Sequence, residues 1–171
     1  MENQSAMTVL AMQGVSVIRG QRRILGPLDF QIRNGERWVV LGPNGAGKST
    51  LLNILATRIF PTTGTVKILD QEMGKVDLFE LRTRIGLCGS VIAEDTPHDE
   101  TVKDVVLTAA YAILGRWNET YDLWDESRAM ALLTNFGVRE LGERLYGTLS
   151  EGEKKRVQIS RALMTDPELL L

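Results

Sequence analysis

Short apolar runs separated by turn residues dominate the first part of the chain, a pattern typical of β-strands. Residues 9–18 and 24–32 are rich in β-branched residues and partly alternate between apolar and polar positions, and residues 19–23 separate the two runs. We therefore expect these runs to form an antiparallel pair of strands. Asn34 and Gly35 follow as a strong turn signal that leads into the next apolar run.

That next run, residues 38–41, precedes a glycine-rich stretch and then a helical pattern. Its sequence Trp-Val-Val-Leu favours a short buried strand, and Leu51, Ile54 and Leu55 fall on one face of a helix. Strand, loop and helix are thus expected in succession. Residues 65–69 predict a further strand after a turn.

The α/β pattern continues for one more helix and strand. Residues 78–84 favour a helix, and residues 84–88 favour a returning strand that ends at Gly89 and Ser90. A polar loop at residues 94–100 comes next, and a block without any strand pattern follows it.

This block predicts two helices with clear start and stop signals. Thr101 and Asp104 suggest a capping box for a helix that Gly115 closes, and a second helix is expected from about 122 to 136 with Gly137 as its stop. The expected inner faces are Val102, Val105, Val106, Ala109, Ala110 and Ile113 in the first helix, and Ala129, Leu132, Leu133 and Phe136 in the second.

A further helix start is expected near the end of the chain. Ser150 with Glu153 forms a capping-box pattern, and Ile159, Ala162 and Leu163 follow as an apolar face. On physical grounds alone this is an ordinary helix start that needs no function.

Composition fits a folded globular domain of 171 residues, 43% hydrophobic and 25% charged. Twenty Lys and Arg against 22 Asp and Glu give a formal charge of -2, so we expect no nucleic-acid partner. The single Cys88 excludes an internal disulfide. Residues 1–6 lack the features of a signal peptide, and the longest uncharged apolar run, 105–114, is too short to span a bilayer.

The strongest chemical signal is the pattern G-x-x-x-x-G-K-[ST] between the strand at 38–41 and the helix behind it. Glycines let the backbone turn its N–H groups toward phosphate oxygens, Lys48 reaches the β- and γ-phosphates, and the Ser49 hydroxyl ligates Mg²⁺. The alternative is an ordinary glycine-rich turn before a helix. The predicted phosphate-binding residues are Gly42, Pro43, Asn44, Gly45, Ala46, Gly47, Lys48, Ser49 and Thr50.

Asp70 follows the strand predicted at residues 65–69, a position that suits a metal-binding carboxylate. However, Lys67 lies inside this strand, and residues 71–74 look like a hairpin turn. We therefore favour a structural position for Asp70 over a Mg²⁺ ligand.

Residues 42–50 and 149–153 together make the chain resemble the nucleotide-binding subunit of an ATP-binding cassette (ABC) transporter. The first stretch matches the Walker A motif of that family, and the second resembles the signature Leu-Ser-Gly-Gly-Gln, with Glu151 and Glu153 as departures. The resemblance implies an α/β P-loop nucleoside triphosphate hydrolase fold of ABC ATPase type, with an N-terminal antiparallel β part and a helical insert.

Within this single ABC-type domain, residues 1–171, the resemblance implies three parts. They are a nucleotide-binding core with a β subdomain (1–95), a helical subdomain (96–150), and the signature helix with the start of the Walker B strand (151–171).

The resemblance also implies ATP and Mg²⁺ as cofactors and a second cassette as partner, in a homodimer or heterodimer that sandwiches ATP. Leu149, Ser150 and Gly152 of one cassette would then contact the γ-phosphate held by the other. Members of the family usually have an aromatic residue that stacks on adenine near the turn after the first strand. This chain has Ile18 and Arg19 there instead, so Arg19 is the candidate base contact. Ser90 stands by register where the family has a Gln that contacts Mg²⁺, which makes it a candidate metal ligand.

Residues 166–171 resemble the approach to the family's Walker B strand, and the sequence ends before the expected Mg²⁺-binding Asp and the catalytic Glu. The switch His would follow them. We therefore expect an incomplete domain that contains the phosphate loop without catalytic residues. The full-length protein would be an ATPase, and the 171-residue chain would be inactive.

These features are compatible with three functions. The favoured one is an ATPase subunit that drives transport through a separate transmembrane permease, at the cytoplasmic face of the cell membrane. The others are a soluble ABC protein that acts on ribosomes or other assemblies, and a nucleotide-binding module that never hydrolyses. The cargo would be chosen by the membrane partner, so it cannot be predicted from this chain.

Overall fold

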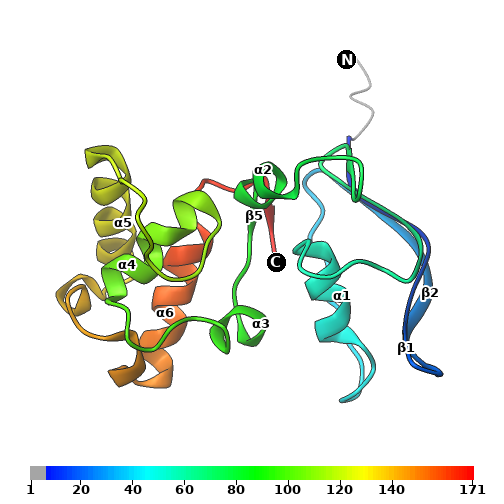
Figure 1. Ribbon diagram of the computed structural model, residues 1–171, viewed down its shortest axis with the longest axis horizontal. Helices are drawn as coiled ribbons and strands as arrows, with labels where there is room; N and C mark the ends of the chain where they lie inside the picture. The colour runs from blue at the N-terminus through cyan, green and yellow to red at the C-terminus, as the bar shows by residue number, and fades with distance from the viewer. Residues whose placement is uncertain (1–6) are drawn as a thin grey trace. The chain divides into compact units, whose positions relative to one another are not determined.

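The computed structural model describes residues 7–171, and the chain forms two compact units, one ending at Leu81 and the other spanning Arg82–Leu171 (Figure 1). Residues 1–6, which were predicted not to form a signal peptide, lie outside the described residues. The division of the domain at 95 and 150 stays a prediction. No helix within residues 7–171 has the length and apolar character needed to cross a membrane.

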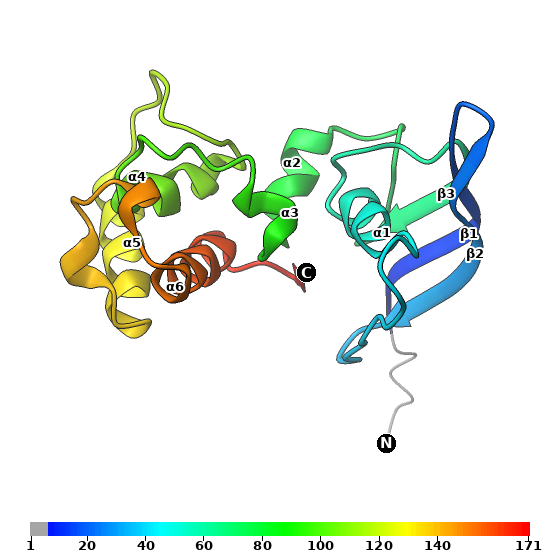
Figure 2. The same cartoon turned by 90° about the horizontal axis from the view of Figure 1, so that it is seen from below.

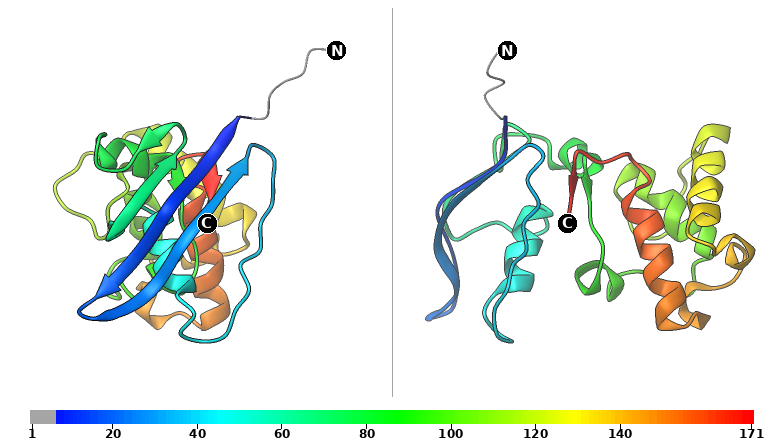
Figure 3. Two further views of the ribbon diagram at one scale, coloured as in Figure 1. Left: turned by 90° about the vertical axis from the view of Figure 1, so that its right-hand side faces the viewer. Right: turned by 180° about the vertical axis from the view of Figure 1, so that it is seen from behind.

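An antiparallel four-stranded sheet forms most of the first unit. Its strands are β1 (Thr8–Arg19), β2 (Arg22–Arg33), β3 (Thr63–Ile68) and β4 (Gln71–Glu72), in the order β2-β1-β3-β4. Figure 2 shows β1, β2 and β3 of this sheet. The predicted antiparallel pair is confirmed as β1 and β2, the two long strands in Figure 3.

The buried positions of this sheet follow the alternation of its strands. Leu10 of β1 lies opposite Ile68 of β3, and Met12 lies opposite Val66. All four side chains are buried, because every second residue of a strand points to the same face. Helix α1 (Lys48–Leu55) belongs to the same unit and buries Leu51, Ile54 and Leu55, which confirms the predicted face.

The strand predicted at residues 38–41 is wrong. Residues 36–43 carry no strand, and the Val39 and Leu41 side chains are 80% and 87% exposed. A strand exists only where a neighbour completes its hydrogen-bond ladder, and within residues 7–171 no strand pairs with this segment. The apolar character of the segment was thus correctly recognised, but its burial was not.

The hairpin that joins β3 and β4 turns at residues 69–70, two residues before the predicted range 71–74, and a second turn follows β4 at residues 73–74. Leu69 and Asp70 adopt positive φ of 51° and 62°, and Gln71 then pairs with Ile68 as part of β4. Asp tolerates this left-handed conformation because its short polar side chain hydrogen-bonds locally. Asp70 is exposed at this turn, which agrees with the structural role that the sequence favours for it over a Mg²⁺ ligand.

The second unit contains helices α3 (Ser90–Ala93), α4 (Val102–Leu107), α5 (Leu123–Asn135) and α6 (Glu151–Ala162), with 3₁₀ turns η1 (Thr108–Tyr111), η2 (Arg139–Leu141) and η3 (Tyr146–Thr148). Helix α2 (Leu78–Thr83) crosses the boundary between the units and confirms the predicted helix there. Helices α4, α5 and α6 surround one apolar core (Figure 2). Its buried members are Val102, Val105, Val106, Leu107, Ala109, Ala129, Leu133, Val138, Leu141, Tyr146, Leu149, Val157 and Met164.

Thr101 and Ser150 cap their helices as predicted, with Asp104 accepting from the Thr101 hydroxyl instead of its backbone N–H, but the predicted end of the first helix is wrong. Thr101, Asp122 and Ser150 each accept a hydrogen bond from the first turn of their helix. The first helix of the block ends at Leu107 instead of continuing to Gly115. The Thr108 hydroxyl donates to the Val105 carbonyl at 3.2 Å, a side-chain bond that competes with the α-helical ladder, and the chain tightens into η1.

The apolar face predicted for α6 is also partly wrong. Ile159 is 37% exposed, whereas Val157, Ser160 and Arg161 are buried beside Ala162. Val157 belongs to the apolar core of this unit, and on the same side of the helix the Arg161 guanidinium donates to the Ile113 carbonyl at 2.8 Å. The buried face of α6 therefore combines apolar and polar residues, which an apolar pattern alone does not reveal.

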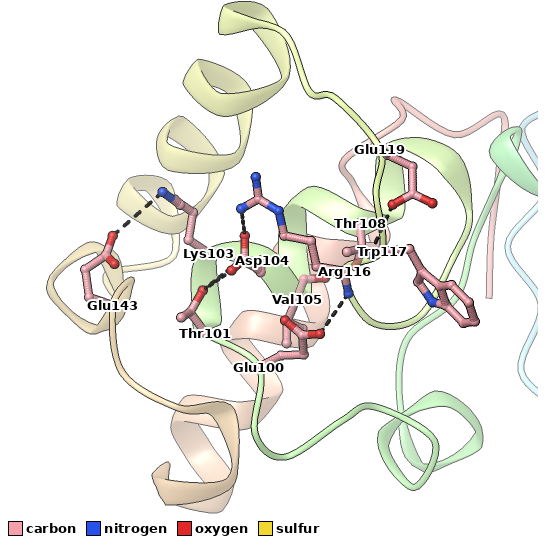
Figure 4. Close-up of polar contacts among 10 residues, drawn as sticks. All are labelled: Glu100, Thr101, Lys103, Asp104, Val105, Thr108, Arg116, Trp117, Glu119 and Glu143. Carbon is pink, nitrogen blue, oxygen red and sulfur yellow. Dashed lines mark hydrogen bonds and ion pairs between the residues drawn. The ribbon is translucent and has the colours of Figure 1, made fainter.

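The connection between α4 and α5 is tied to the start of α4 by Arg116 (Figure 4). Its Nη1 donates to Asp104 Oδ1 at 2.6 Å, and its backbone N donates to Glu100 Oε1 at 2.8 Å. Asp104 also accepts from the Thr101 hydroxyl at 2.8 Å. The Arg116 guanidinium lies 5.6 Å from the centre of the Tyr121 ring, and burial raises the pKa of Tyr121 to about 12. This network anchors the connection to the N-terminus of α4.

Two short parallel strands, β5 (Ile85–Gly86) and β6 (Leu169–Leu170), complete the second unit. The strand predicted over residues 84–88 is confirmed in place but is shorter, although the Cys88 N–H still donates to the Leu171 carbonyl at 2.9 Å. A Cβ at Gly86 would lie 2.4 Å from the Ala162 carbonyl oxygen, so only glycine allows this close approach.

Tyr146→Phe should destabilise the second unit by about 1–3 kcal/mol, because it leaves a buried donor without its acceptor. The Tyr146 hydroxyl accepts from Gln158 Nε2 at 2.7 Å, and Tyr146 is only 1% exposed. Denaturant unfolding measures the effect. Tyr111→Phe is the matched control, since it removes the same group from a ring that is 36% exposed. Equal unfolding midpoints for both variants would contradict a stabilising role for the buried hydrogen bond.

Candidate functional site

The glycine-rich loop, residues 42–49, leads directly into α1 and depends on backbone conformations that favour glycine. Gly45 and Gly47 adopt φ of 81° and 90°, and Gly47 is the N-cap of α1. A Cβ at position 47 would lie 2.8 Å from the Ile24 carbonyl oxygen and 2.9 Å from Leu25 Cδ1. The glycine therefore lets the loop pack against β2 while it turns into the helix.

Lys48 folds back over this loop. Its Nζ donates to the Gly42 carbonyl at 2.6 Å and to the Pro43 carbonyl at 2.7 Å. These two bonds hold the ammonium group inside the curve of the loop. A lysine ammonium has three donors, so one remains for an anion that approaches the loop.

The start of α1 favours a negative ligand. The first N–H groups of a helix have no intrahelical acceptor, and they carry the positive end of the helix dipole. The first turn of α1 contains no acidic residue that would neutralise it. Ser49 is exposed in this turn, where its hydroxyl is accessible to a ligand. Loop, ammonium group and helix start thus form a cradle that fits a phosphate chain.

Metal binding at this cradle would depend on few protein groups. Among residues 7–171, no three His, Cys, Asp or Glu side chains gather closely enough to hold a metal ion. The Ser49 hydroxyl and the oxygens of a phosphate chain are the donors that this cradle would offer to a cation. This donor set suits Mg²⁺, which usually binds with one or two protein ligands and substrate phosphates.

The structure places Arg19 at the end of β1, opposite Arg22 and next to the β1–β2 turn. Arg19 is exposed, and Ile18 beside it is 39% exposed. Phe30 and Trp38 in the same unit stack on each other, with ring centres 5.7 Å apart. Arg19 is thus accessible to a flat ligand.

Ser150 and its neighbours form the start of α6 in the second unit. The Ser150 hydroxyl accepts from the Glu153 backbone N–H at 3.4 Å, and the Glu153 carboxylate accepts from the Ser150 backbone N–H at 2.7 Å. This reciprocal pair confirms the predicted capping box. The hydrogen bonds from the Ser150 hydroxyl and backbone hold the pKa of Glu153 below its usual value.

The other signature positions have different environments. Leu149 is 6% exposed and its side chain belongs to the apolar core, so only its backbone is available to a ligand. Gly152 is exposed, and a Cβ there would meet no atom within 4 Å. Sequence reasoning missed Lys154, whose Nζ lies 3.2 Å from Glu151 Oε1 and 5.9 Å from the centre of the Tyr146 ring. The spacing of Glu151 and Lys154, three residues apart on a helix, was the available signal.

Ser90 does not stand at the end of a strand. Strand β5 ends at Gly86, and Ser90 is the exposed first residue of α3, with Gly89 as its N-cap. Cys88, just before it, is half-buried, and this burial raises the pKa of its thiol. Ser90 belongs to the second unit, whereas residues 42–50 belong to the first.

Comparison with known proteins gives a consistent result. The family model described as ABC transporter matches residues 25–171. The chain is 40% identical over 164 residues to an uncharacterized ABC transporter ATP-binding protein, YlmA of Bacillus subtilis, covering 95% of this chain and 62% of YlmA. It is 37% identical over 171 residues to the phosphonates import ATP-binding protein PhnC of Anaeromyxobacter dehalogenans, covering 95% of this chain and 33% of PhnC.

Among solved structures, a dimeric ATP-binding cassette in a post-hydrolysis state, bound to ADP and Pi, is similar with a TM-score of 0.79 and 25% identity. The match covers 94% of this chain and 72% of that one. This agrees with the P-loop fold expected from the sequence. The chain spans less than two thirds of YlmA.

Proposed function

Because this chain belongs to the ABC transporter family, we propose that it is the ATP-binding part of a transporter and that the full-length protein hydrolyses ATP to drive transport. The observation that carries the proposal is the loop at residues 42–49, in which Lys48 is held by two loop carbonyls beside the start of α1. Titration calorimetry with Mg-ATP on the parent chain and on Lys48→Ala tests it.

The phosphates of ATP would lie in the cradle formed by the loop and α1. The N–H groups of Gly45, Gly47 and Lys48 point their dipoles at the phosphate oxygens, and the Lys48 ammonium pairs with the β- and γ-phosphates. Gly42, Pro43, Asn44 and Ala46 shape the turn, and the Thr50 N–H lies in the first helical turn. This arrangement binds the shared triphosphate rather than the base.

Mg²⁺ would be held at the Ser49 hydroxyl, with Ser90 as a second candidate ligand. When bound, the ion neutralises charge on the β- and γ-phosphate oxygens. Exposure of Ser49 at the helix start supports its role. The role of Ser90 depends on its helix start, α3, approaching the nucleotide in the full-length protein.

We propose that two such chains, or this chain and a related one, sandwich ATP between them. The start of α6 supports this, because Ser150 and Gly152 are both exposed there and a Cβ at Gly152 would meet no atom of residues 7–171 within 4 Å. Leu149 would contribute its backbone only. The similar solved cassette is itself described as dimeric with ADP and Pi bound.

The remaining partners are proposed on the family relationship. ATP hydrolysis by this subunit would drive transport through a separate transmembrane permease. The subunit would bind this permease at the cytoplasmic face of the membrane. An Asp and a Glu following Leu171 would supply the second Mg²⁺ ligand and the general base. The relatives described above have transporter names, and none of them supports the alternative of a ribosome-associated or assembly-associated protein.

GTP should compete with ATP for this site within about tenfold, a difference of about 1.4 kcal/mol. Positions 18 and 19, where the base is expected, hold Ile and Arg and no aromatic residue. The Arg19 guanidinium can stack on adenine and guanine alike, so it does not distinguish ATP from GTP. A competition assay with labelled ATP measures the ratio, and Arg19→Ala should weaken both nucleotides alike. A much stronger preference for ATP would mean that another residue recognises the base.

A further inference from the structure

The N-terminus of α6 already binds an anion, a carboxylate of its own chain. The Ser150 backbone N–H donates to Glu153 Oε2 at 2.7 Å, and the Ser150 hydroxyl donates to the same oxygen at 2.6 Å. Serine has only these two hydrogen-bond donors. Both of them therefore converge on one oxygen of Glu153.

A carboxylate in this position resembles a bound phosphate oxygen. Helix N-termini bind carboxylates and phosphates through the same donors and the same positive dipole end. The hydrogen bonds here involve an ionised acceptor, and such bonds are about twice as strong as neutral ones. A phosphate that approaches Ser150 must displace this carboxylate before it gains either donor.

We propose that Glu153 is an internal competitor for the phosphate that Ser150 contacts across the dimer, and that it weakens the ATP-dependent pairing of two chains. The inference rests on the proposed role of Ser150 in the ATP sandwich. Glu153 acts in two ways, because its carboxylate engages the hydroxyl and also repels the incoming negative charge. Pairing thus requires Glu153 to leave Ser150 first.

A glutamine at position 153 separates these effects from the structural role of the residue. Glutamine preserves the capping box, because its amide oxygen still accepts from the Ser150 backbone N–H. It carries no charge, so it releases the Ser150 hydroxyl more readily and does not repel a phosphate. The start of α6 should therefore stay folded while its affinity for an anion increases.

Glu151 provides a matched comparison within the same helical turn. Its carboxylate pairs with Lys154 Nζ at 3.2 Å rather than with Ser150. Lys154 is anchored in turn over the face of the Tyr146 ring. Glu151→Gln removes the same charge from the same end of α6 without changing the hydrogen bonds of Ser150.

The experiment compares the full-length protein with its Glu153→Gln and Glu151→Gln variants. Sedimentation velocity with ATP in the absence of Mg²⁺, which prevents hydrolysis, gives the dimer dissociation constant. We expect Glu153→Gln to lower this constant by about tenfold, the size of one charged hydrogen bond, and Glu151→Gln to change it by less than about twofold. Melting curves without nucleotide should coincide for the two variants.

Equal gains in both glutamine variants would overturn the inference, because they would indicate a general charge effect. A dissociation constant that stays unchanged or rises in Glu153→Gln would also overturn it, as would the absence of dimers in every variant.

Ser150→Ala separates this inference from the proposed function. If Ser150→Ala leaves ATP-dependent pairing intact, the proposed role of Ser150 in the sandwich fails. If it abolishes pairing, that role is supported. A gain from Glu153→Gln that is undiminished in the Ser150→Ala background would overturn the inference alone, since release of the hydroxyl would then contribute nothing to it.

Discussion

The 171-residue chain should release phosphate from Mg-ATP no faster than the uncatalysed background, whereas the full-length protein should turn over. Phosphoryl transfer to water needs an oriented water, a base to position it, and metal ions that neutralise the phosphates. The chain supplies the loop at residues 42–49 and the Ser49 hydroxyl, and no metal-binding group of three carboxylate, His or Cys side chains gathers among residues 7–171. In the proposed function, an Asp and a Glu that follow Leu171 supply the second Mg²⁺ ligand and the base.

Phosphate release by the purified chain and by the extended protein measures this difference, after a circular-dichroism melt has shown that each is folded. Lys48→Ala in the extended protein is the control for contaminating phosphatases, because it should abolish turnover. Steady release by the folded 171-residue chain that Lys48→Ala removes would contradict the prediction. Asp70, at the exposed β3–β4 turn, and Glu151, paired with Lys154, would then be the first carboxylates to test.

Local signals in the sequence predicted much of both units correctly. The side chains of Thr101, Asp122 and Ser150 each cap a helix, because a cap depends only on residues within one turn of it. Leu51, Ile54 and Leu55 are buried along α1 for a similar reason, since helical spacing alone aligns them. The antiparallel pairing of β1 and β2 also follows from neighbouring segments.

Features that depend on distant partners were predicted less well. Residues 38–41 are apolar, but a strand there needs a neighbour that local sequence does not identify. Strand β5 is limited to the length over which it pairs with β6, more than 80 residues away in the sequence. Ile159 is 37% exposed, whereas Arg161 of the same helix is buried and donates to the carbonyl of Ile113, 48 positions away in the sequence.

In the candidate site, too, local features were predictable from the sequence and contacts between separate residues were not. The loop motif at residues 42–49 was recognisable because a phosphate loop is contiguous in sequence. The hydrogen bonds from Lys48 to two loop carbonyls, and the burial of the Leu149 side chain, required the structure. The capture of both Ser150 donors by Glu153 likewise exceeds what the capping-box pattern predicts.

Lys48→Ala should weaken ATP binding by about 100-fold. A hydrogen bond to a charged group is worth about 1.5–3 kcal/mol, and Lys48 is proposed to contact two phosphates, so a loss of about 3 kcal/mol is a conservative expectation. The same ammonium also bonds to the Gly42 and Pro43 carbonyls, so its removal loosens the loop that aligns the remaining N–H donors. Both effects act in the same direction.

Titration calorimetry of Mg-ATP into the folded chain tests the central claim most directly, with Lys67→Ala as the matched control. Lys67 is an exposed lysine of β3 in the same unit, so its loss makes the same change in net charge away from the loop. The account predicts saturable binding by the parent and by Lys67→Ala, and a roughly 100-fold loss in Lys48→Ala. Equal affinities for the parent and Lys48→Ala would contradict the assignment of residues 42–49 as the ATP phosphate site.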